Sequence, residues 1–388
     1  MELYIHIPFC TQKCQYCSFV SFPAEESEKE EYIRALLQEA DIRKDEFTEP
    51  VSTVFIGGGT PSLLSAEQLV RLVNNLKCSI KIDPDAEFTI EANPGTITES
   101  FVQAARQIGI NRFSMGMQAY QEKLLGLLGR IHTFQEVAES VELLKKYQIT
   151  NFNLDLMFGI PEQTKKDWME TLEAAVSLDP AHISAYGLIP EEDTPLYNLL
   201  QSGKLALPEP EEEREMYDAA IRLLSRNAYV QYEISNFSRK GFECRHNIGY
   251  WTQRPYVGLG ISAASMVNFR KDKTGLRYVR KTNPSGWHQY FQMIGSKDVS
   301  LIETDIISPG EARFETIMLA LRMNQGISEK KFQELHSVTI GSCYEKQLKK
   351  MEQLGLLQHK NESWMLTPKG MDIQNSVLVE FMEDDTGE

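Results

Sequence analysis

Three cysteines lie close together near the start of the chain, at Cys10, Cys14 and Cys17. They form a C-x3-C-x2-C pattern directly after a β-rich run, Leu3–Ile7. Three thiolates on one short loop can bind three irons of a [4Fe–4S] cluster, whose usual protein complement is four cysteines. The fourth iron would keep an open coordination position, as a catalytic zinc ion does. A zinc site without its fourth ligand and a chance group of buried thiols are the alternatives.

Further polar residues follow later β-rich runs. Gly57-Gly58-Gly59-Thr60-Pro61 leaves the backbone bare, so that its polar groups can approach a ligand closely. The segment is not a phosphate-binding P-loop, because no Gly-Lys-Ser/Thr follows at the required spacing. A glycine triplet is by itself weak evidence, since it is usually a turn.

Single side chains with binding chemistry stand near the ends of other runs. Glu91 is an acceptor-only carboxylate that could bind ribose hydroxyls, or it could be a solvated strand end. Arg130 and Asp155 could clamp a carboxylate or form an ordinary ion pair. In the segment His246-Asn247-Ile248-Gly249-Tyr250-Trp251, the histidine is on its own most simply a packing or hydrogen-bonding residue.

The elements that must position these residues form an alternating pattern. Six β-rich runs alternate with amphipathic helical segments, which is typical of parallel strands joined by helical crossovers. The expected strands are Leu3–Ile7, Ser52–Ile56, Glu87–Glu91, Arg112–Met115, Asn151–Leu156 and His182–Tyr186. The expected helices are Glu28–Lys44, Ala66–Leu76, Glu99–Ile108, Phe134–Tyr147 and Lys166–Leu178. The pattern predicts an α/β fold, a partial (β/α)6 TIM-like barrel whose loops after the strands build the site.

The remainder of the chain is expected to divide into further parts. Residues 191–305, with a helix from Glu211 to about Arg226, are expected to extend the barrel sheet and carry the His246 segment. Residues 306–380 read as three helices and a hairpin, Leu356–Gln358 with Ser363–Leu366, and predict a winged-helix-like α+β module. The predicted parts are thus the barrel at 1–190, its extension, this module and an acidic tail at 381–388.

Composition excludes several classes of function. The 388 residues include 40 Lys and Arg against 55 Asp and Glu, a net charge of −15. Such a charge repels phosphates, so it disfavours a nucleic-acid partner despite the winged-helix-like module. No apolar stretch is long enough for a membrane helix, and the N-terminus does not resemble a signal peptide. We therefore expect a cytoplasmic protein, in which a tight cysteine cluster indicates metal or redox chemistry.

These motifs together resemble a known family. The cysteine triplet is similar to that of the radical S-adenosylmethionine superfamily, and the chain resembles its branch of oxygen-independent coproporphyrinogen III oxidases and HemW-type haem chaperones. The likeness extends from Tyr4-Ile-His-Ile-Pro-Phe-Cys10 to the His246–Trp251 segment and the C-terminal module. It implies a [4Fe–4S] cluster on the three cysteines and S-adenosylmethionine on its open iron.

The resemblance also assigns expected contacts. For S-adenosylmethionine these are Tyr4, Tyr16, Gly58, Gly59, Thr60, Glu91, Gln118, Arg130 and Asp155. For haem they are His246, Asn247, Tyr250 and Trp251, where imidazole could ligate iron and aromatic rings could flank the macrocycle. Cys244 is an alternative thiolate ligand, although like Cys78 and Cys343 it is more simply a small apolar residue.

Two departures from the oxidases favour a chaperone. The oxidases have another cysteine one residue after the triplet, where this chain has Ser18 and Phe19, and they have a segment ahead of the barrel. The expected function is delivery of haem to acceptor haemoproteins, with a reductant such as flavodoxin or ferredoxin. The alternative is coproporphyrinogen oxidation, so whether the protein is an enzyme stays open. A regulator that associates with nucleic acid through the C-terminal module is the third hypothesis.

Overall fold

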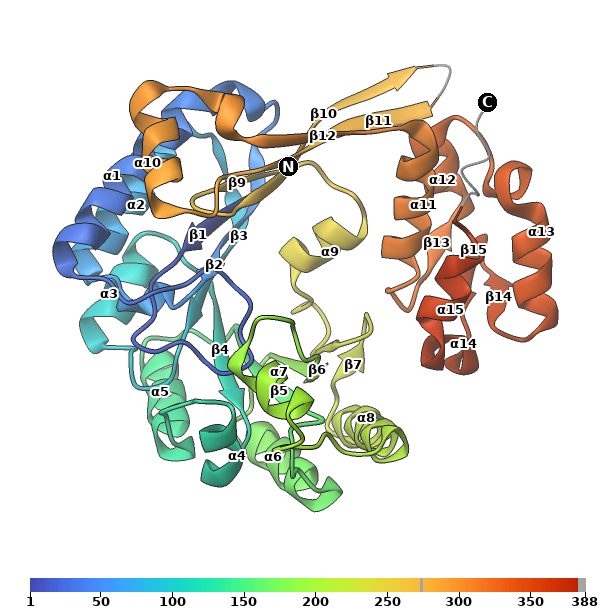
Figure 1. Ribbon diagram of the computed structural model, residues 1–388, viewed down its shortest axis with the longest axis horizontal. Helices are drawn as coiled ribbons and strands as arrows, with labels where there is room; N and C mark the ends of the chain where they lie inside the picture. Colours follow the sequence, from blue (N-terminus) through green and yellow to red (C-terminus); the bar gives the residue numbers. More distant parts are fainter. Residues whose placement is uncertain (273–274, 383–388) are drawn as a thin grey trace.

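The computed structural model describes residues 1–272 and 275–382 of the chain (Figure 1). The acidic tail predicted at 381–388 therefore lies outside the described residues from residue 383 onward. Within the described ranges, no helix has the length and apolar character needed to cross a membrane.

Seven parallel strands form the centre of the sheet, in the order β9-β1-β2-β3-β4-β5-β6. Six of them are the strands that the sequence predicts, and β9 is a seventh that comes from the extension. Their bounds are β1 Glu2–Ile7, β2 Val51–Gly58, β3 Ile82–Ala92, β4 Arg112–Gln118, β5 Phe152–Phe158, β6 His182–Gly187 and β9 Tyr256–Leu259. Every residue of β4 is buried, as expected for a parallel strand covered on both faces.

Helices cover the outer face of this sheet, as Figure 1 shows. The five predicted helices all form, with ends within three residues of the predicted ones: α1 Glu26–Ile42, α2 Ala66–Ser79, α3 Glu99–Gln107, α5 Phe134–Lys146 and α6 Lys165–Ser177. Their starts are determined locally: Ser65, Thr133 and Thr164 each cap a helix, with a reciprocal side chain three residues later. The helix predicted from Glu211 is α8, Pro210–Arg226.

Strands from the extension enlarge the sheet at both edges. Beyond β6 lie β8 (Asn236–Ser238) and β7 (Val230–Gln231), and beyond β9 lie β10 (Ala264–Asp272), β11 (Gly275–Thr282) and β12 (Glu303–Ile307), all antiparallel to their neighbours. Among the described strands, β12 and β7 form the two ends of the order. The barrel is therefore open, as the partial-barrel prediction states.

Short helices that the sequence does not predict fill the connections. They are α4 Glu122–Leu127, α7 Pro195–Gln201, α9 Arg245–Trp251 and α10 Trp287–Ser296, together with the 3-10 turns η1 Lys44–Glu46, η2 Pro61–Leu63 and η3 Val299–Leu301. Helix α9 carries the His246 segment and lies on the side of the barrel that faces the C-terminal module (Figure 1).

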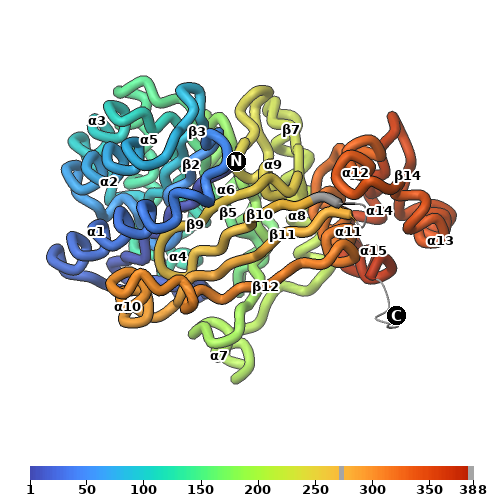
Figure 2. Tube along the Cα trace, turned by 90° about the horizontal axis from the view of Figure 1, so that it is seen from above, coloured from blue at the N-terminus to red at the C-terminus, as the bar shows by residue number. Residues whose placement is uncertain are grey.

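The C-terminal module has its own hydrophobic core, which includes Phe332, Tyr344 and Leu348. Its elements are α11 Pro309–Ala320, β13 Ile327–Ser328, α12 Glu329–His336, α13 Ile340–Gln353, β14 Leu357–Lys360, β15 Ser363–Leu366, α14 Pro368–Asp372 and α15 Gln374–Val379. Three helices and a hairpin form as predicted, and β13 adds a third strand beside β15. Figure 2 shows strands β10 to β12 running from the barrel toward this module.

Candidate functional site

One pocket collects most of the predicted site residues where β1 to β5 end. Its volume is about 460 Å³, and it lies at the edge of the sheet where loops after parallel strands converge. It is lined by all three cysteines of the triplet and by eight of the nine predicted cofactor contacts, all except Tyr4. The eight are Tyr16, Gly58, Gly59, Thr60, Glu91, Gln118, Arg130 and Asp155.

The three cysteines lie on the loop that follows β1, and each thiol is free and half-buried. Arg130 donates from Nη1 to the Cys14 sulfur at 3.5 Å, and Thr60 Oγ1 lies 3.5 Å from the Cys10 sulfur. The thiolate is the form of cysteine that binds metal. At Cys17, burial raises the thiol pKa.

The donor set fits a cluster better than a single ion. Across residues 1–272 and 275–382, no three His, Cys, Asp or Glu side chains are placed to hold one metal ion. A cubane cluster needs no such convergence, because each thiolate binds a different iron. The three thiols all face the same pocket, which suits the cluster and disfavours the alternative of a zinc site.

The glycine segment packs directly against the cysteine loop. Backbone N–H groups of Gly59 and Thr60 donate to the carbonyls of Ile7 and Phe9, at 2.8 and 2.7 Å. A Cβ on Gly59 would lie 2.6 Å from the Phe9 carbonyl oxygen, closer than real contacts allow. Gly58 has a φ of +113°, a conformation that side chains rarely adopt. Glycine is therefore required for the two loops to meet.

Two half-buried carboxyl groups face the pocket. Gly58 N–H donates to Glu91 Oε2 at 2.9 Å, yet burial and the nearby Asp155 charge raise the pKa of Glu91 to about 8. Asp155 accepts from Asn153 at 2.8 Å and Ser114 at 3.1 Å, and burial raises its pKa as well. Carboxyl groups with raised pKa values favour a ligand that brings positive charge or hydroxyl donors to them.

Arg130 and Gln118 line the same pocket by different means. Arg130 donates from Nη2 to Asn93 Oδ1 at 2.9 Å and to the Gly116 carbonyl at 2.7 Å. The ion pair considered between Arg130 and Asp155 is not among the ion pairs of the described residues, because the guanidinium is held by these other acceptors. Gln118 follows a register shift in β4 and has a φ of +61°, which turns its side chain at the strand end.

Several lining residues are missing from the sequence prediction. Asn93 joins the glycine segment to Arg130, because it donates to Thr60 Oγ1 at 2.9 Å and accepts from the guanidinium. The Asn93-Pro94-Gly95 turn after β3 is the sequence feature that could have indicated Asn93. Four further missed residues have no comparable signal, because they lie within strands of the sheet; they are Ser114, Gly116, Met157 and Tyr186.

Tyr4 lies in a second cavity, of about 630 Å³, that adjoins the first. The two share Phe19, Gly58 and Glu91 as lining residues. The Tyr4 hydroxyl lies 3.0 Å from His6 Nδ1, whose ring is held by the Val20 carbonyl at 2.8 Å. Tyr4 therefore faces the space next to the cysteine pocket and does not line that pocket.

The residues of the His246 segment on α9 have different surroundings: some are buried and others line the second cavity. His246 is 1% exposed, and its Nδ1 and Nε2 lie 2.8 Å from Thr53 Oγ1 and 2.9 Å from the Tyr250 hydroxyl. Burial lowers its pKa to about 3, so the ring is neutral. Tyr250 and Trp251 line the second cavity, whereas Asn247 is half-buried and lines neither cavity.

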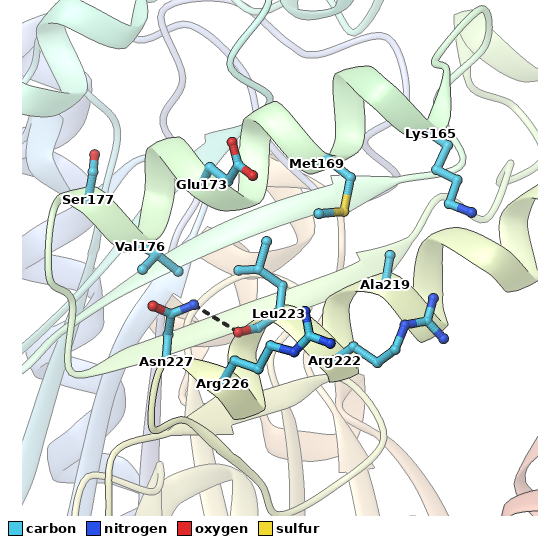
Figure 3. A pocket seen from close by; sticks show the side chains of 10 residues that line it. All are labelled: Lys165, Met169, Glu173, Val176, Ser177, Ala219, Arg222, Leu223, Arg226 and Asn227. Carbon is cyan, nitrogen blue, oxygen red and sulfur yellow. Dashed lines mark hydrogen bonds between the residues drawn. The ribbon is translucent and has the colours of Figure 1, made fainter.

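A third hollow lies outside the barrel, between α6 and α8. Figure 3 shows this groove, of about 690 Å³, with Arg222 and Arg226 on one wall and Glu173 on the other. It contains none of the predicted site residues, so the candidate site is the pair of adjoining cavities.

Comparisons with known proteins show which families this chain resembles. A family model described as "Radical SAM superfamily" matches residues 4–175, and one described as "HemN C-terminal domain" matches residues 307–373. The protein named "Heme chaperone HemW" from Bacillus subtilis (strain 168) is 35% identical over 381 residues, 98% of each chain. Its namesake from Escherichia coli (strain K12) is 33% identical over 390 residues, 99% of this chain and 98% of that one.

A solved structure shares the fold over nearly the whole chain. It is titled "Coproporphyrinogen III oxidase (HemN) from Escherichia coli is a Radical SAM enzyme" and matches with a TM-score of 0.82. The match covers 98% of this chain and 89% of the other, at 22% sequence identity. Similarity at this level shows a common fold and does not by itself show a common reaction.

Proposed function

The chain belongs to the HemW family of radical SAM proteins, and from that membership we propose that it is a haem chaperone, which binds haem and delivers it to acceptor haemoproteins. The observation that carries the proposal is the similarity over almost the entire chain to proteins named "Heme chaperone HemW", at 35% identity for the Bacillus subtilis protein. The oxidase structure is similar over the same length at only 22% identity.

The cysteine pocket is proposed to hold a [4Fe–4S] cluster and S-adenosylmethionine. Cys10, Cys14 and Cys17 would bind the cluster. When bound, the reduced cluster can supply the electron that cleaves the sulfonium of S-adenosylmethionine. The chain's own part is to position and desolvate the cofactor: the bare backbone of Gly58 and Gly59 admits close approach, and the carboxylates receive its donors.

The haem side is proposed to involve the α9 segment. Tyr250 and Trp251 present aromatic surface to the second cavity, where a flat macrocycle could stack. Ligation of haem iron by His246 would require one ring nitrogen of this buried side chain to give up its partner, Thr53 at Nδ1 or Tyr250 at Nε2. The present geometry therefore favours His246 as a positioning residue that holds the Tyr250 ring.

Coproporphyrinogen oxidation is the competing function. The shared fold and the C-terminal module favour it, while Ser18 and Phe19 in place of the additional cysteine oppose it. Partners and location belong to the proposal: an acceptor haemoprotein, a flavodoxin or ferredoxin as reductant, and the cytoplasm. The acidic balance of the chain disfavours nucleic acid.

One anaerobic experiment separates the two functions. The cluster is reconstituted and the chain receives S-adenosylmethionine and a reductant; coproporphyrinogen conversion and haem binding are then measured on the same preparation. We expect one saturable haem site and no protoporphyrinogen. Robust formation of protoporphyrinogen would show that the chain is an oxidase.

The role of His246 is tested in the same titration with His246→Ala. If His246 positions Tyr250, the variant loses stability by about 1 to 3 kcal/mol, because buried hydrogen bonds are lost, while the ligand-field bands of the haem spectrum stay unchanged. A changed axial-ligand spectrum would instead show that His246 ligates the iron.

A further inference from the structure

The second cavity is enclosed by parts of the chain that lie far apart in sequence. Its walls come from β1, the cysteine loop, α9, strands β9 to β11 and, on the far side, helix α11 of the C-terminal module. The lining is largely aromatic and aliphatic, and its 630 Å³ lies in the usual range of small-molecule sites. Apolar lining residues include Phe19, Tyr250, Trp251, Tyr256, Met266 and Met318.

One cation faces this apolar space. Arg280, on β11, is the only lysine or arginine among the described residues that line the cavity. Its Nη2 lies 2.7 and 2.8 Å from the two carboxylate oxygens of Glu315, which belongs to α11. A planar guanidinium is well suited to bind a carboxylate on two oxygens. Arg280 therefore forms a site in this cavity that can bind a carboxylate, and the chain's own Glu315 occupies that site.

The internal pair is easy to exchange. Arg280 is 39% exposed and Glu315 14%, and partly exposed ion pairs contribute little to stability. Glu315 also accepts a hydrogen bond from the Tyr278 hydroxyl, so its carboxylate would keep a partner if Arg280 left. An incoming carboxylate could thus take the guanidinium while Glu315 kept one hydrogen bond, from Tyr278.

We propose that this cavity is the haem site and that Arg280 binds a haem propionate in exchange for Glu315. The inference rests on the proposed haem function and goes beyond it, because it assigns the site to the boundary between barrel and module. The Arg280–Glu315 pair links β11 to α11, so its exchange loosens one contact between the two parts. Haem binding is thereby coupled to the position of the C-terminal module.

The test compares two probes and two arginines on the full chain with its cluster. Iron protoporphyrin IX and its dimethyl ester, which lacks free carboxylates, are titrated into wild type, Arg280→Leu and Arg277→Leu. Arg277 is a matched control, because it lies three residues earlier on β11 and is exposed. Odd and even positions of a strand face opposite sides.

Wild type is expected to bind haem roughly tenfold more tightly than the dimethyl ester, because the ester has no free carboxylate to pair with Arg280. Arg280→Leu is expected to weaken haem binding by a similar factor and to abolish the preference over the ester, whereas Arg277→Leu behaves as wild type. Glu315→Gln, which weakens the competing pair, is expected to bind haem at least as tightly as wild type.

The outcomes separate this inference from the proposed function. If wild type binds haem and its ester equally and Arg280→Leu changes neither, the propionate site is overturned while the haem function stands. If wild type binds no haem at all, both fail. The ester comparison in wild type needs no variant, so a folding defect in Arg280→Leu leaves the inference open to refutation.

Discussion

At the scale of single residues, the chemistry depends on half-buried groups that lie in one pocket with few charges to balance them. The Cys14 sulfur accepts a hydrogen bond from Arg130, while the carboxyl groups of Glu91 and Asp155 have raised pKa values in the same pocket. Raised carboxyl pKa values of this kind cluster at functional sites, because a site prepared for a ligand lacks that ligand's donors.

The cysteine assignment predicts a selective loss of metal. Cys14→Ala removes the central thiolate of the loop, so anaerobic reconstitution should give little or no bound iron and sulfide. Cys78→Ala is the control, because Cys78 is exposed on α2 and lies outside the pocket. Iron and sulfide content per chain is the measurement; a full complement in Cys14→Ala would contradict the assignment.

The burial of Glu2 predicts that the free energy of unfolding decreases as the pH rises. Its carboxylate is buried without a hydrogen-bond partner, and burial raises its pKa to about 8. A raised carboxyl pKa contributes stability that is present below the ordinary value of about 4.5 and is lost as the pH rises through 8. Between pH 5 and 8, wild type should lose on the order of 3 kcal/mol more unfolding free energy than Glu2→Gln.

Urea unfolding at several pH values measures this difference. Glu31→Gln is the matched control, because Glu31 is exposed on α1, and it should follow the wild-type pH dependence. Parallel curves for wild type and Glu2→Gln would show that Glu2 does not titrate as its burial requires.

At the scale of elements, the close approach of two loops builds the site. The cysteine loop after β1 and the glycine segment after β2 are joined by backbone hydrogen bonds, and these fix Cys10 next to Thr60. The register of parallel β1 and β2 brings both loops to the same end, since Ile7 pairs with Gly58. Neither loop could form this pocket alone.

Gly59→Ala tests that approach. The added methyl would meet backbone atoms of Phe9 and Ile7, which cannot rotate away, so we expect a loss of about 1 to 3 kcal/mol and a lower cluster yield. Gly126→Ala, on α4, has open space around its Cβ and should be neutral or stabilising by up to about 1 kcal/mol. Urea unfolding and iron content of the two variants check this; equal behaviour would contradict the role of Gly59.

The sequence predicts the long elements well and the short ones poorly, for physical reasons. Helices such as α5 have a repeating apolar face and their own caps, so local signals suffice. Helices α4 and α9, of six and seven residues, are too short to show a period and are held by tertiary packing. Strand β9, of four residues, becomes a barrel strand only because β1 lies beside it.

The same distinction applies to the site. The cysteine triplet is a local motif, so its spacing alone predicts where it lies. Ser114 and Tyr186 reach the pocket only through the curvature of the sheet, which no local pattern encodes. The contact between His246 and Thr53 could not be predicted from the sequence either, because the two residues are 193 positions apart in the chain.

At the scale of the whole molecule, the barrel and the C-terminal module enclose a cavity that neither has alone. The module also differs from a DNA-binding winged helix in its charges: Lys349 pairs with Glu345 and Lys350 with Glu380, so the basic side of α13 is partly neutralised. Residues of its helix α11 line the second cavity, and the net charge of −15 disfavours a nucleic-acid partner.

Transfer of haem to an acceptor protein distinguishes a haem chaperone from an oxidase. The full chain, with its cluster and S-adenosylmethionine bound, is loaded with one equivalent of haem and mixed anaerobically with an apo-globin as the acceptor. If the chain is a haem chaperone, the absorbance spectrum of the holo-globin appears faster than from a haem–albumin control, while added coproporphyrinogen is not consumed. Haem that stays on the chain, or coproporphyrinogen that is converted, would contradict it.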